Sequence, residues 1–321
     1  MTAIVEIKDL CKSYRKNKPN AVDHLSLEIE KGAIYAFIGP NGAGKTTTIR
    51  ILTTLLKLDS GEVRISGYRV DTHPRDVRRV LGYIPDEFGL YGEMLVHEYL
   101  EFFAGCYHIP SEQRAKIAND LLELVGLAHR REDEVHGLSR GMRQRLGLAR
   151  ALVHDPSVII ADEPAAGLDP RARVELREIF RVLQDMGKTI FLSSHVLREL
   201  DDVATHMGII EEGKLVASGP VGSIRGRLRP HRRVRVSFLG PSDDAQVWLA
   251  AQPDILNVEV ANGNGSEKAP TLLITLAGDT EEAVVQLLAQ IVGAGFAVLG
   301  YKEEHDTLES MFLNLTQGIV S

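Results

Sequence analysis

One short motif constrains this chain more than any other part of its sequence. A run of five apolar residues, Ile34–Ile38, leads directly into Gly-Pro-Asn-Gly-Ala-Gly-Lys-Thr at residues 39–46. This string matches the pattern G-x-x-x-x-G-K-[ST], in which glycines let the backbone curl and point its amide groups at a phosphate. A stretch compatible with a helix, Lys45–Leu56, follows. The order of strand, glycine-rich turn and helix predicts an α/β fold that binds a nucleoside triphosphate.

Within this turn the backbone supplies most of the predicted contacts, and two side chains add charge and coordination. Lys45 would reach the β- and γ-phosphates, and the Thr46 hydroxyl would be a ligand of Mg²⁺. The other residues expected around the triphosphate are Gly39, Pro40, Asn41, Gly42, Ala43, Gly44 and Thr47. The motif therefore implies a magnesium–nucleotide complex as the ligand.

A second apolar strand, Val158–Ala161, ends in two adjacent acids, Asp162 and Glu163. Two carboxylates after a buried strand are costly unless they meet a cation or hydrogen-bond donors. Taken alone, they would be interpreted as an ordinary acidic turn at a strand end. Together with the phosphate loop, they favour a catalytic interpretation in which Asp162 holds Mg²⁺ and Glu163 polarises the attacking water as a general base.

The length and charge of the chain limit the classes of protein to which it can belong. With 321 residues the chain has room for two domains. Its 37 Lys and Arg residues against 44 Asp and Glu residues give a formal charge of −7, which disfavours a nucleic-acid binder that relies on bulk charge. No apolar run approaches a membrane span, and Cys11 and Cys106 form no C-x-x-C pair. We therefore expect a soluble chain in a reduced compartment, with any membrane role coming through a partner.

The residue pattern changes twice along the chain. Strand-like runs, among them residues 4–10, 25–29, 63–66, 80–84 and 189–192, frame a stretch of helical periodicity from 94 to 153. Six arginines between Arg225 and Arg235 are interpreted as a solvated linker. Beyond them, expected strands at 234–239, 257–260, 272–276 and 296–301 alternate with helices at 243–251 and 281–291. The order βαββαβ predicts a small α+β domain of ferredoxin-like type, closed by an amphipathic segment at 307–315.

The sequence between the phosphate loop and the paired acids adds a resemblance to a known family. Residues 138–145, Leu-Ser-Arg-Gly-Met-Arg-Gln-Arg, resemble the signature motif of ABC ATPases, with Arg140 in the place of the family's second glycine. After the acids, residues 167–170, Gly-Leu-Asp-Pro, are similar to the family's D-loop. The order and rough spacing of these motifs hold across residues 1–217. The resemblance implies a P-loop ABC ATPase domain over residues 1–229, with a helical subdomain near 86–155, followed by the α+β accessory domain over 230–321.

The resemblance also implies roles for single residues. Ser139, a residue type that favours a helix N-cap, and Gly141 would face a phosphate, and Asp169 would belong to the same nucleotide-binding set. Tyr14 stands where an aromatic residue stacks on adenine in the family. His195 follows the last core strand as the family's switch histidine does, where it would meet the γ-phosphate.

One position departs from the family pattern. The family has a glutamine after the strand Gly82-Tyr-Ile-Pro85, where this chain has Asp86. Aspartate can be a ligand of Mg²⁺, but it is one methylene shorter than glutamine and donates no hydrogen bond when ionised. We therefore place Asp86 among both the metal ligands and the catalytic residues, and we expect altered water activation or coupling at this site.

ABC ATPases hydrolyse ATP between two copies, so the single phosphate loop and single signature of this chain imply a second ATP-binding subunit, either a homodimer partner or a paralogue. The resemblance implies an exporter subunit, cytoplasmic and peripheral on the inner face of the cell membrane through a separate permease. Phe88 and Tyr91, aromatic residues of an expected exposed loop, would meet that permease. No nucleic-acid partner is expected. Two alternatives stay open: a soluble ABC ATPase acting on ribosomes or nucleic acid, and an ATP-binding regulatory module with low turnover.

Overall fold

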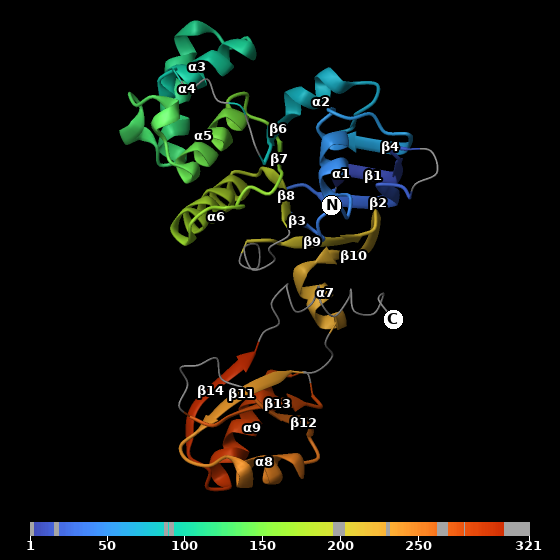
Figure 1. Cartoon of the computed structure of the whole chain (residues 1–321), viewed down its shortest axis with the longest axis vertical. Coiled ribbons are helices and arrows are strands. Elements are labelled where there is room, and N and C mark those ends of the chain that lie inside the picture. Colours follow the sequence, from blue (N-terminus) through green and yellow to red (C-terminus); the bar gives the residue numbers. More distant parts are fainter. Residues whose placement is uncertain are drawn as a thin grey trace. The chain divides into compact units, whose positions relative to one another are not determined.

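Figure 1 shows the computed structural model of the chain. The structure describes residues 3–15, 19–86, 89, 93–194, 203–228, 232–261, 269–278 and 280–304, without the side chains of residues 225–228. The chain divides into two compact units, with the boundary between Ile224 and Arg225. Within the described ranges no helix has the length and apolar character needed to cross a membrane.

The first unit is built around a six-stranded sheet. Its strands, in spatial order, are β10 (Lys214–Pro220), β9 (His206–Glu211), β3 (Ile34–Ile38), β8 (Thr189–Ser194), β7 (Val158–Ala161) and β6 (Leu81–Ile84). All of them run parallel except β10. Every residue of β3, β7 and β8 is buried, which agrees with the unbroken apolar sequences of β3 and β7. Because parallel strands end at the same edge of a sheet, the turn after β3 and the acids after β7 meet there.

A second, antiparallel sheet shares its hydrophobic core with the first. Its order is β2 (Val22–Glu30), β1 (Ala3–Lys12), β4 (Ser60–Ile65) and β5 (Tyr68–Arg69). From Leu25 onward alternate residues of β2 are buried, as the period of two in the sequence predicts. Buried side chains from both sheets, such as Ile7 and Phe37, form one cluster with Ile49 of helix α1 (Lys45–Leu52). This shared core fixes α1 and the turn before it against the central sheet.

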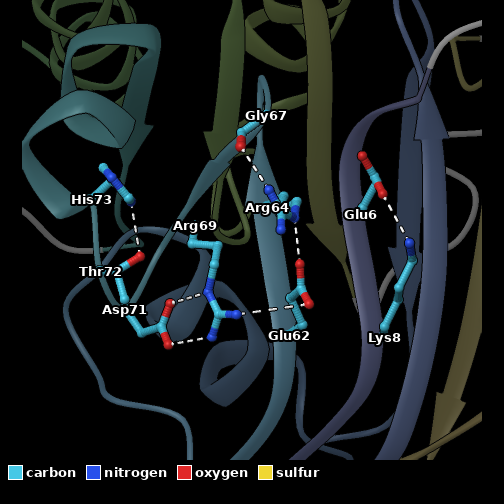
Figure 2. Close-up of polar contacts among 9 residues, drawn as sticks. All are labelled: Glu6, Lys8, Glu62, Arg64, Gly67, Arg69, Asp71, Thr72 and His73. Atoms are coloured by element: carbon cyan, nitrogen blue, oxygen red, sulfur yellow. Dashed lines mark hydrogen bonds and ion pairs between the residues drawn. The ribbon is translucent and has the colours of Figure 1, made fainter.

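The solvent face of the antiparallel sheet carries a ladder of paired charges (Figure 2). Arg64 of β4 and Arg69 of β5 are direct cross-strand neighbours, an arrangement that alone would be unfavourable. Glu62 pairs with Arg64 and lies 3.8 Å from Arg69, and Asp71 lies 2.7 Å from Arg69. The hydrogen bond from Arg64 lowers the pKa of Glu62. The acids therefore offset the repulsion between the two arginines, and this face carries charges of both signs.

Helices occupy the stretch where the sequence predicts helical periodicity. They are α3 (Val96–Cys106), α4 (Ser111–Leu124), two short 3₁₀ turns at Ala128–Arg130 and Val135–Gly137, and α5 (Arg140–Leu152), and they gather in one group in Figure 1. Helices α2 (Pro74–Val80) and α6 (Pro170–Asp185) complete the unit. Helix α1 ends at Leu52 and not at the predicted Leu56, because Thr54 takes a left-handed φ of 63°.

The second unit confirms the predicted βαββαβ order. Its elements are β11 (Arg233–Phe238), α8 (Asp243–Ala250), β12 (Ile255–Val260), β13 (Thr271–Leu276), α9 (Glu281–Gly293) and β14 (Val298–Glu304). All neighbouring strands are antiparallel in the order β12-β13-β11-β14, which is the ferredoxin-like arrangement. Strand β14 begins two residues later than predicted, because Gly295 turns the chain with a φ of 88° and Phe296 packs into the core ahead of the strand. The amphipathic segment 307–315 lies outside the described residues.

The arginine-rich stretch is not the solvated linker that the sequence predicts. Its beginning belongs to helix α7 (Val221–Leu228) and its end to β11. Arg232 lies 2.8 Å from Glu303, Arg233 pairs with Glu259 of β12, and Arg235 pairs with Glu304 of the neighbouring strand β14. Sequence reasoning missed these pairs because the glutamates come from elsewhere in the chain and meet the arginines only in the folded sheet.

Candidate nucleotide-binding site

The turn between β3 and α1 folds into a tight cradle because its glycines allow close backbone approach. Gly44 has a φ of 109°, and a Cβ there would lie 2.4 Å from the Ala21 carbonyl oxygen. A Cβ at Gly39 would lie 2.3 Å from the carbonyl oxygen of Ile210 on β9. Neither position has room for a side chain. The glycines of the motif are therefore required by packing here, and the turn leads directly into the N-terminus of α1.

Lys45 is the most deeply buried cation of this cradle, with 5% of its surface exposed. Its ammonium donates to the carbonyl oxygens of Gly39, at 2.7 Å, and Pro40, at 3.3 Å. Its Nζ also lies 3.4 Å from Oε1 of Glu163. Burying a lysine in this way is costly unless its charge is compensated. The contacts bring the predicted phosphate-binding lysine and the predicted base into one site.

The two acids after β7 have different surroundings. Asp162 is 4% exposed, and its Oδ1 accepts a hydrogen bond of 2.6 Å from the Ser193 hydroxyl. The same hydroxyl accepts the backbone N–H of Glu163 at 2.9 Å. Glu163 itself has a φ of 49°, which is uncommon for a residue with a side chain. Ser193, which sequence reasoning missed, thus fixes the backbone and one carboxylate of the acidic pair.

A cavity of about 540 Å³ brings most of the predicted residues together. Its wall includes Tyr14, whose hydroxyl lies 3.3 Å from Oγ1 of Thr47. Asp86 and Glu163, which lie far from the phosphate loop in sequence, line the same cavity. The full lining is Tyr14, Ala21, Pro40, Asn41, Gly42, Gly44, Lys45, Thr46, Thr47, Asp86, Glu163 and Ala166. Gly39, Ala43 and Asp162 are buried and do not belong to this lining.

The oxygen atoms near this cavity are of the type that Mg²⁺ prefers. Thr46 is exposed and lines the cavity, Asp86 lines it too, and Asp162 ends the strand next to it. Burial, the Asp162 charge and to a smaller extent the Asp86 charge raise the pKa of Tyr83 to about 12. Both carboxylates therefore act on the same region, and a hydroxyl with two carboxylates is a donor set that fits Mg²⁺.

The residues of the signature lie in a different cavity. Ser139 is the N-cap of α5 and accepts the Met142 N–H at 3.3 Å, which confirms the expected cap. Asp169 is the N-cap of α6, and its Oδ1 accepts the Ala172 N–H at 2.9 Å. Together with Gly141, these residues line a cavity of about 830 Å³ between α4, α5 and α6. Within one chain, the signature therefore does not line the cavity of the phosphate loop.

Arg140, the residue in place of the family's second glycine, has a defined position. A Cβ at Gly167, which has a φ of 67°, would lie 2.6 Å from the Arg140 guanidinium. The arginine thus packs on the loop that resembles the D-loop. Three other residues named from the sequence, His195, Phe88 and Tyr91, lie outside the described residues.

Comparisons with known proteins decide the family. A family model described as ABC transporter matches residues 22–166. The bacitracin transport ATP-binding protein BcrA of Bacillus licheniformis is 38% identical, over 81% of this chain and 83% of its own.

The chain belongs to the ABC transporter family. It is an ATP-binding subunit, and the family hydrolyses ATP to power transport.

Two further relatives extend the likeness. The daunorubicin/doxorubicin resistance ATP-binding protein DrrA of Streptomyces peucetius is 32% identical over 98% of this chain and 93% of its own, so the alignment includes the second unit. A solved ATP-binding subunit of an ABC transporter matches with a TM-score of 0.63 and 31% identity, covering 70% of this chain and 92% of its own. The predicted fold class is confirmed. Because the alignment with DrrA covers nearly all of this ABC subunit, its second unit has a counterpart in that relative.

Proposed function

We propose that this ABC subunit powers export through a separate membrane-embedded permease. Two observations support the proposal. BcrA and DrrA are named for antibiotic transport and drug resistance, and DrrA aligns with nearly the whole chain. In addition, the described residues contain no helix suited to crossing a membrane, so the translocation path would come from another chain. The subunit would then be cytoplasmic and held at the inner face of the membrane by its permease.

The cavity geometry supports a role for each residue around ATP. The backbone of residues 39–44 and the Lys45 ammonium would hold the phosphates, and Tyr14 would stack on adenine. Thr46, Asp162 and Asp86 would hold Mg²⁺, which when bound neutralises charge on the phosphates. Glu163 would polarise the attacking water as the general base. The 3.4 Å contact between Lys45 and Glu163 carries this assignment, because it puts the base where the phosphate-binding lysine is.

The separation of the two cavities supports a site completed by a second subunit. Ser139, Gly141 and Asp169 line the cavity between α4, α5 and α6, while Lys45 and Glu163 line the other. With one phosphate loop per chain, the signature of each subunit would cover the ATP held by its partner. The partner is a second copy of this chain or a paralogue.

Substitution of Glu163 tests the proposal directly. Glu163→Gln keeps the shape of the side chain but removes the carboxylate, so we expect ATP hydrolysis to fall by about 10²- to 10⁴-fold while ATP binding persists. Steady-state hydrolysis and the ATP-dependent dimer, measured by light scattering, would be compared with the native chain. Glu212→Gln is the matched control, since Glu212 also has a left-handed backbone, with a φ of 46°. Hydrolysis at the native rate in Glu163→Gln would place the base elsewhere.

A regulatory ATP-binding module is the second candidate, and Asp86 is the observation that favours it. Asp86 lines the ATP cavity where the family has a glutamine, so a third negative side chain lies near Asp162 and Glu163. Like charges close to a triphosphate are unfavourable unless a cation lies between them. The steady-state rate of the native chain separates the two candidates, because a regulatory module would bind ATP with little turnover.

A further inference from the structure

A group of side chains outside the ATP cavity has the composition of a metal site. Cys11 Sγ, a carboxylate oxygen of Asp23 and a ring nitrogen of His24 all lie within 4.8 Å of one another. Cys11 belongs to β1, and Asp23 and His24 belong to β2, which pairs with it. Thiolate, carboxylate and imidazole are the three ligand types that Zn²⁺ takes in proteins.

Irregular backbone explains how these three side chains meet. Consecutive residues of a regular strand point to opposite faces of the sheet, so Asp23 and His24 could not share a ligand in a regular strand. His24 has a φ of 51°, and the pairing of β1 with β2 shifts register on both sides of Leu10. The backbone N–H of His24 then donates to Cys11 Sγ at 3.3 Å. The left-handed residue and the bulges bring a thiol, an imidazole and a carboxylate to one place.

A fourth residue holds the imidazole. Nδ1 of His24 lies 2.7 Å from Oδ1 of Asp9, which itself has a left-handed φ of 51°. A carboxylate hydrogen-bonded to the imidazole is the usual outer partner of a metal-bound histidine, because it fixes the ring and increases its basicity. Asp9 therefore supplies the orienting contact that a histidine ligand requires.

Two neighbours of Asp23 bear on whether its carboxylate can reach a metal. The Asn20 amide donates to Oδ1 at 2.8 Å, and Lys214 Nζ lies 3.5 Å from Oδ2. The Lys214 side chain is 69% exposed, so a cation at the site could displace it into solvent at little cost. With a thiolate and the carboxylates of Asp9 and Asp23, the group carries enough negative charge to hold a divalent ion.

We propose that Cys11, Asp23 and His24 bind a divalent transition metal of the zinc class, with Asp9 orienting the imidazole. Binding would release the thiol proton of Cys11 to solvent, because the thiolate is the ligand. Mg²⁺ does not compete, since it prefers oxygen ligands and near-ideal octahedral geometry. The site is thus distinct in chemistry from the metal position beside ATP.

The position of the proposed metal site in the fold means that metal binding would have a structural consequence. Cys11 and Asp23 stand at the two ends of the connection from β1 to β2, which carries Tyr14 and Ala21. Both of these residues line the ATP cavity. A metal bound at Cys11, Asp23 and His24 would tie together the two ends of the segment that forms this part of the cavity wall.

Co²⁺ is the probe that tests the proposal, because it takes the ligands of Zn²⁺ and reports thiolate ligation by a charge-transfer band in the near ultraviolet. The full chain, reduced and free of nucleotide, would be titrated with CoCl₂ and then with ZnCl₂. We expect a saturable thiolate band that Zn²⁺ removes, and a loss of that band in Cys11→Ser. The matched control is Cys106→Ser, which replaces the exposed cysteine outside the cluster and should keep the band.

Two further variants keep the test decisive if Cys11→Ser does not fold. His24→Asn removes the ligand with a residue type that tolerates a left-handed backbone, and it should weaken Co²⁺ binding at least tenfold. Asp9→Asn should weaken binding by about 10- to 100-fold while the thiolate band persists at saturation. Absence of the band in the native chain would overturn the proposal. An unchanged band in folded Cys11→Ser or His24→Asn would overturn it as well.

Discussion

Asp162 and Glu163 are adjacent in sequence, yet one buried hydroxyl makes them act as a unit. Ser193 donates to the Asp162 carboxylate and accepts the Glu163 backbone N–H. The first hydrogen bond holds the Asp162 carboxylate at the end of β7. The second stabilises the left-handed backbone conformation of Glu163, which has a φ of 49°. With the roles proposed for Asp162 and Glu163, Ser193 would be a positioning residue that acts on ATP chemistry through these two neighbours.

Removal of the Ser193 hydroxyl should lower turnover more than affinity. Ser193→Ala removes the hydroxyl that donates to the buried Asp162 carboxylate and accepts from the part-buried Glu163 N–H, a loss of about 1–3 kcal/mol for each bond. We expect kcat to fall by roughly tenfold or more with KM for ATP changed less, since Lys45 and the phosphate loop are untouched. Ser193→Thr keeps the hydroxyl and should restore most of the rate. Equal loss in both variants would show a packing effect and not a hydrogen-bond effect.

The two acids could be predicted from sequence, whereas Ser193 could not. Asp162 and Glu163 follow a short apolar run directly, so their place at a strand end is visible in the sequence. Ser193 comes into contact with them because β7 and β8 are parallel neighbours in a register that pairs Ala161 with Leu192. Neither the strand order nor the register is encoded by a local pattern. The same reason hides the glutamates that pair with the arginines of β11.

At the scale of elements, local patterns predict buried strands and helical stretches but not where an element stops. β3 and β7 have the predicted bounds because each apolar run ends at a glycine or an acid. α1 ends early because Thr54 takes a left-handed φ of 63°, a choice that a periodic pattern does not record. In the second unit, the order of elements was predictable because each strand and helix is short and bounded by turn residues. The cluster of Cys11 and His24 was not predictable, because bulges in the pairing of β1 with β2 break the alternation of side chains between the two faces of the sheet.

The packing of the residues after α3 and α5 against β6 predicts an acid-sensitive contact at His154. Its ring stacks on Tyr107 with centroids 3.9 Å apart, and its Nε2 lies 3.0 Å from the Leu81 carbonyl oxygen. Among the described residues, its buried Nδ1 has no hydrogen-bond partner. Burial lowers the pKa of His154 below its usual value of 6.5. The folded protein therefore binds this proton less well than the unfolded chain does, and stability is lost as the pH falls below about 6.5.

Thermal unfolding at several pH values would check this contact. The midpoint of the native chain should fall by a few degrees more between pH 7.5 and 5.5 than that of His154→Gln, which can donate to Leu81 but does not titrate. His108→Gln replaces an exposed histidine and should behave as the native chain. Parallel curves for the native chain and His154→Gln would contradict the assignment.

At the scale of the whole molecule, the two cavities of the first unit indicate that two subunits would each contribute one part of every ATP site. The phosphate loop and Glu163, the proposed base, line one cavity, and the residues of the signature line the other. A chain with this arrangement presents half of each of two sites, and a second subunit related by a twofold axis would complete both. The sequence indicates this from motif counts alone, but it leaves open whether the partner is identical.

Mixing two inactive variants separates an identical partner from a paralogue. Lys45→Ala disables the phosphate loop, and Ser139→Asp keeps the N-cap of α5 while turning a negative charge toward the partner's phosphate. Each variant alone should lack hydrolysis, because both sites of its homodimer contain a defect. In a mixed dimer one site combines the intact loop of one chain with the intact signature of the other, so random exchange should recover about a quarter of the native rate. Recovery that depends on both variants establishes the homodimer. If the native chain is active only with a second polypeptide and the mixture stays inactive, the homodimer is excluded, and the signature that covers Lys45 belongs to a paralogue.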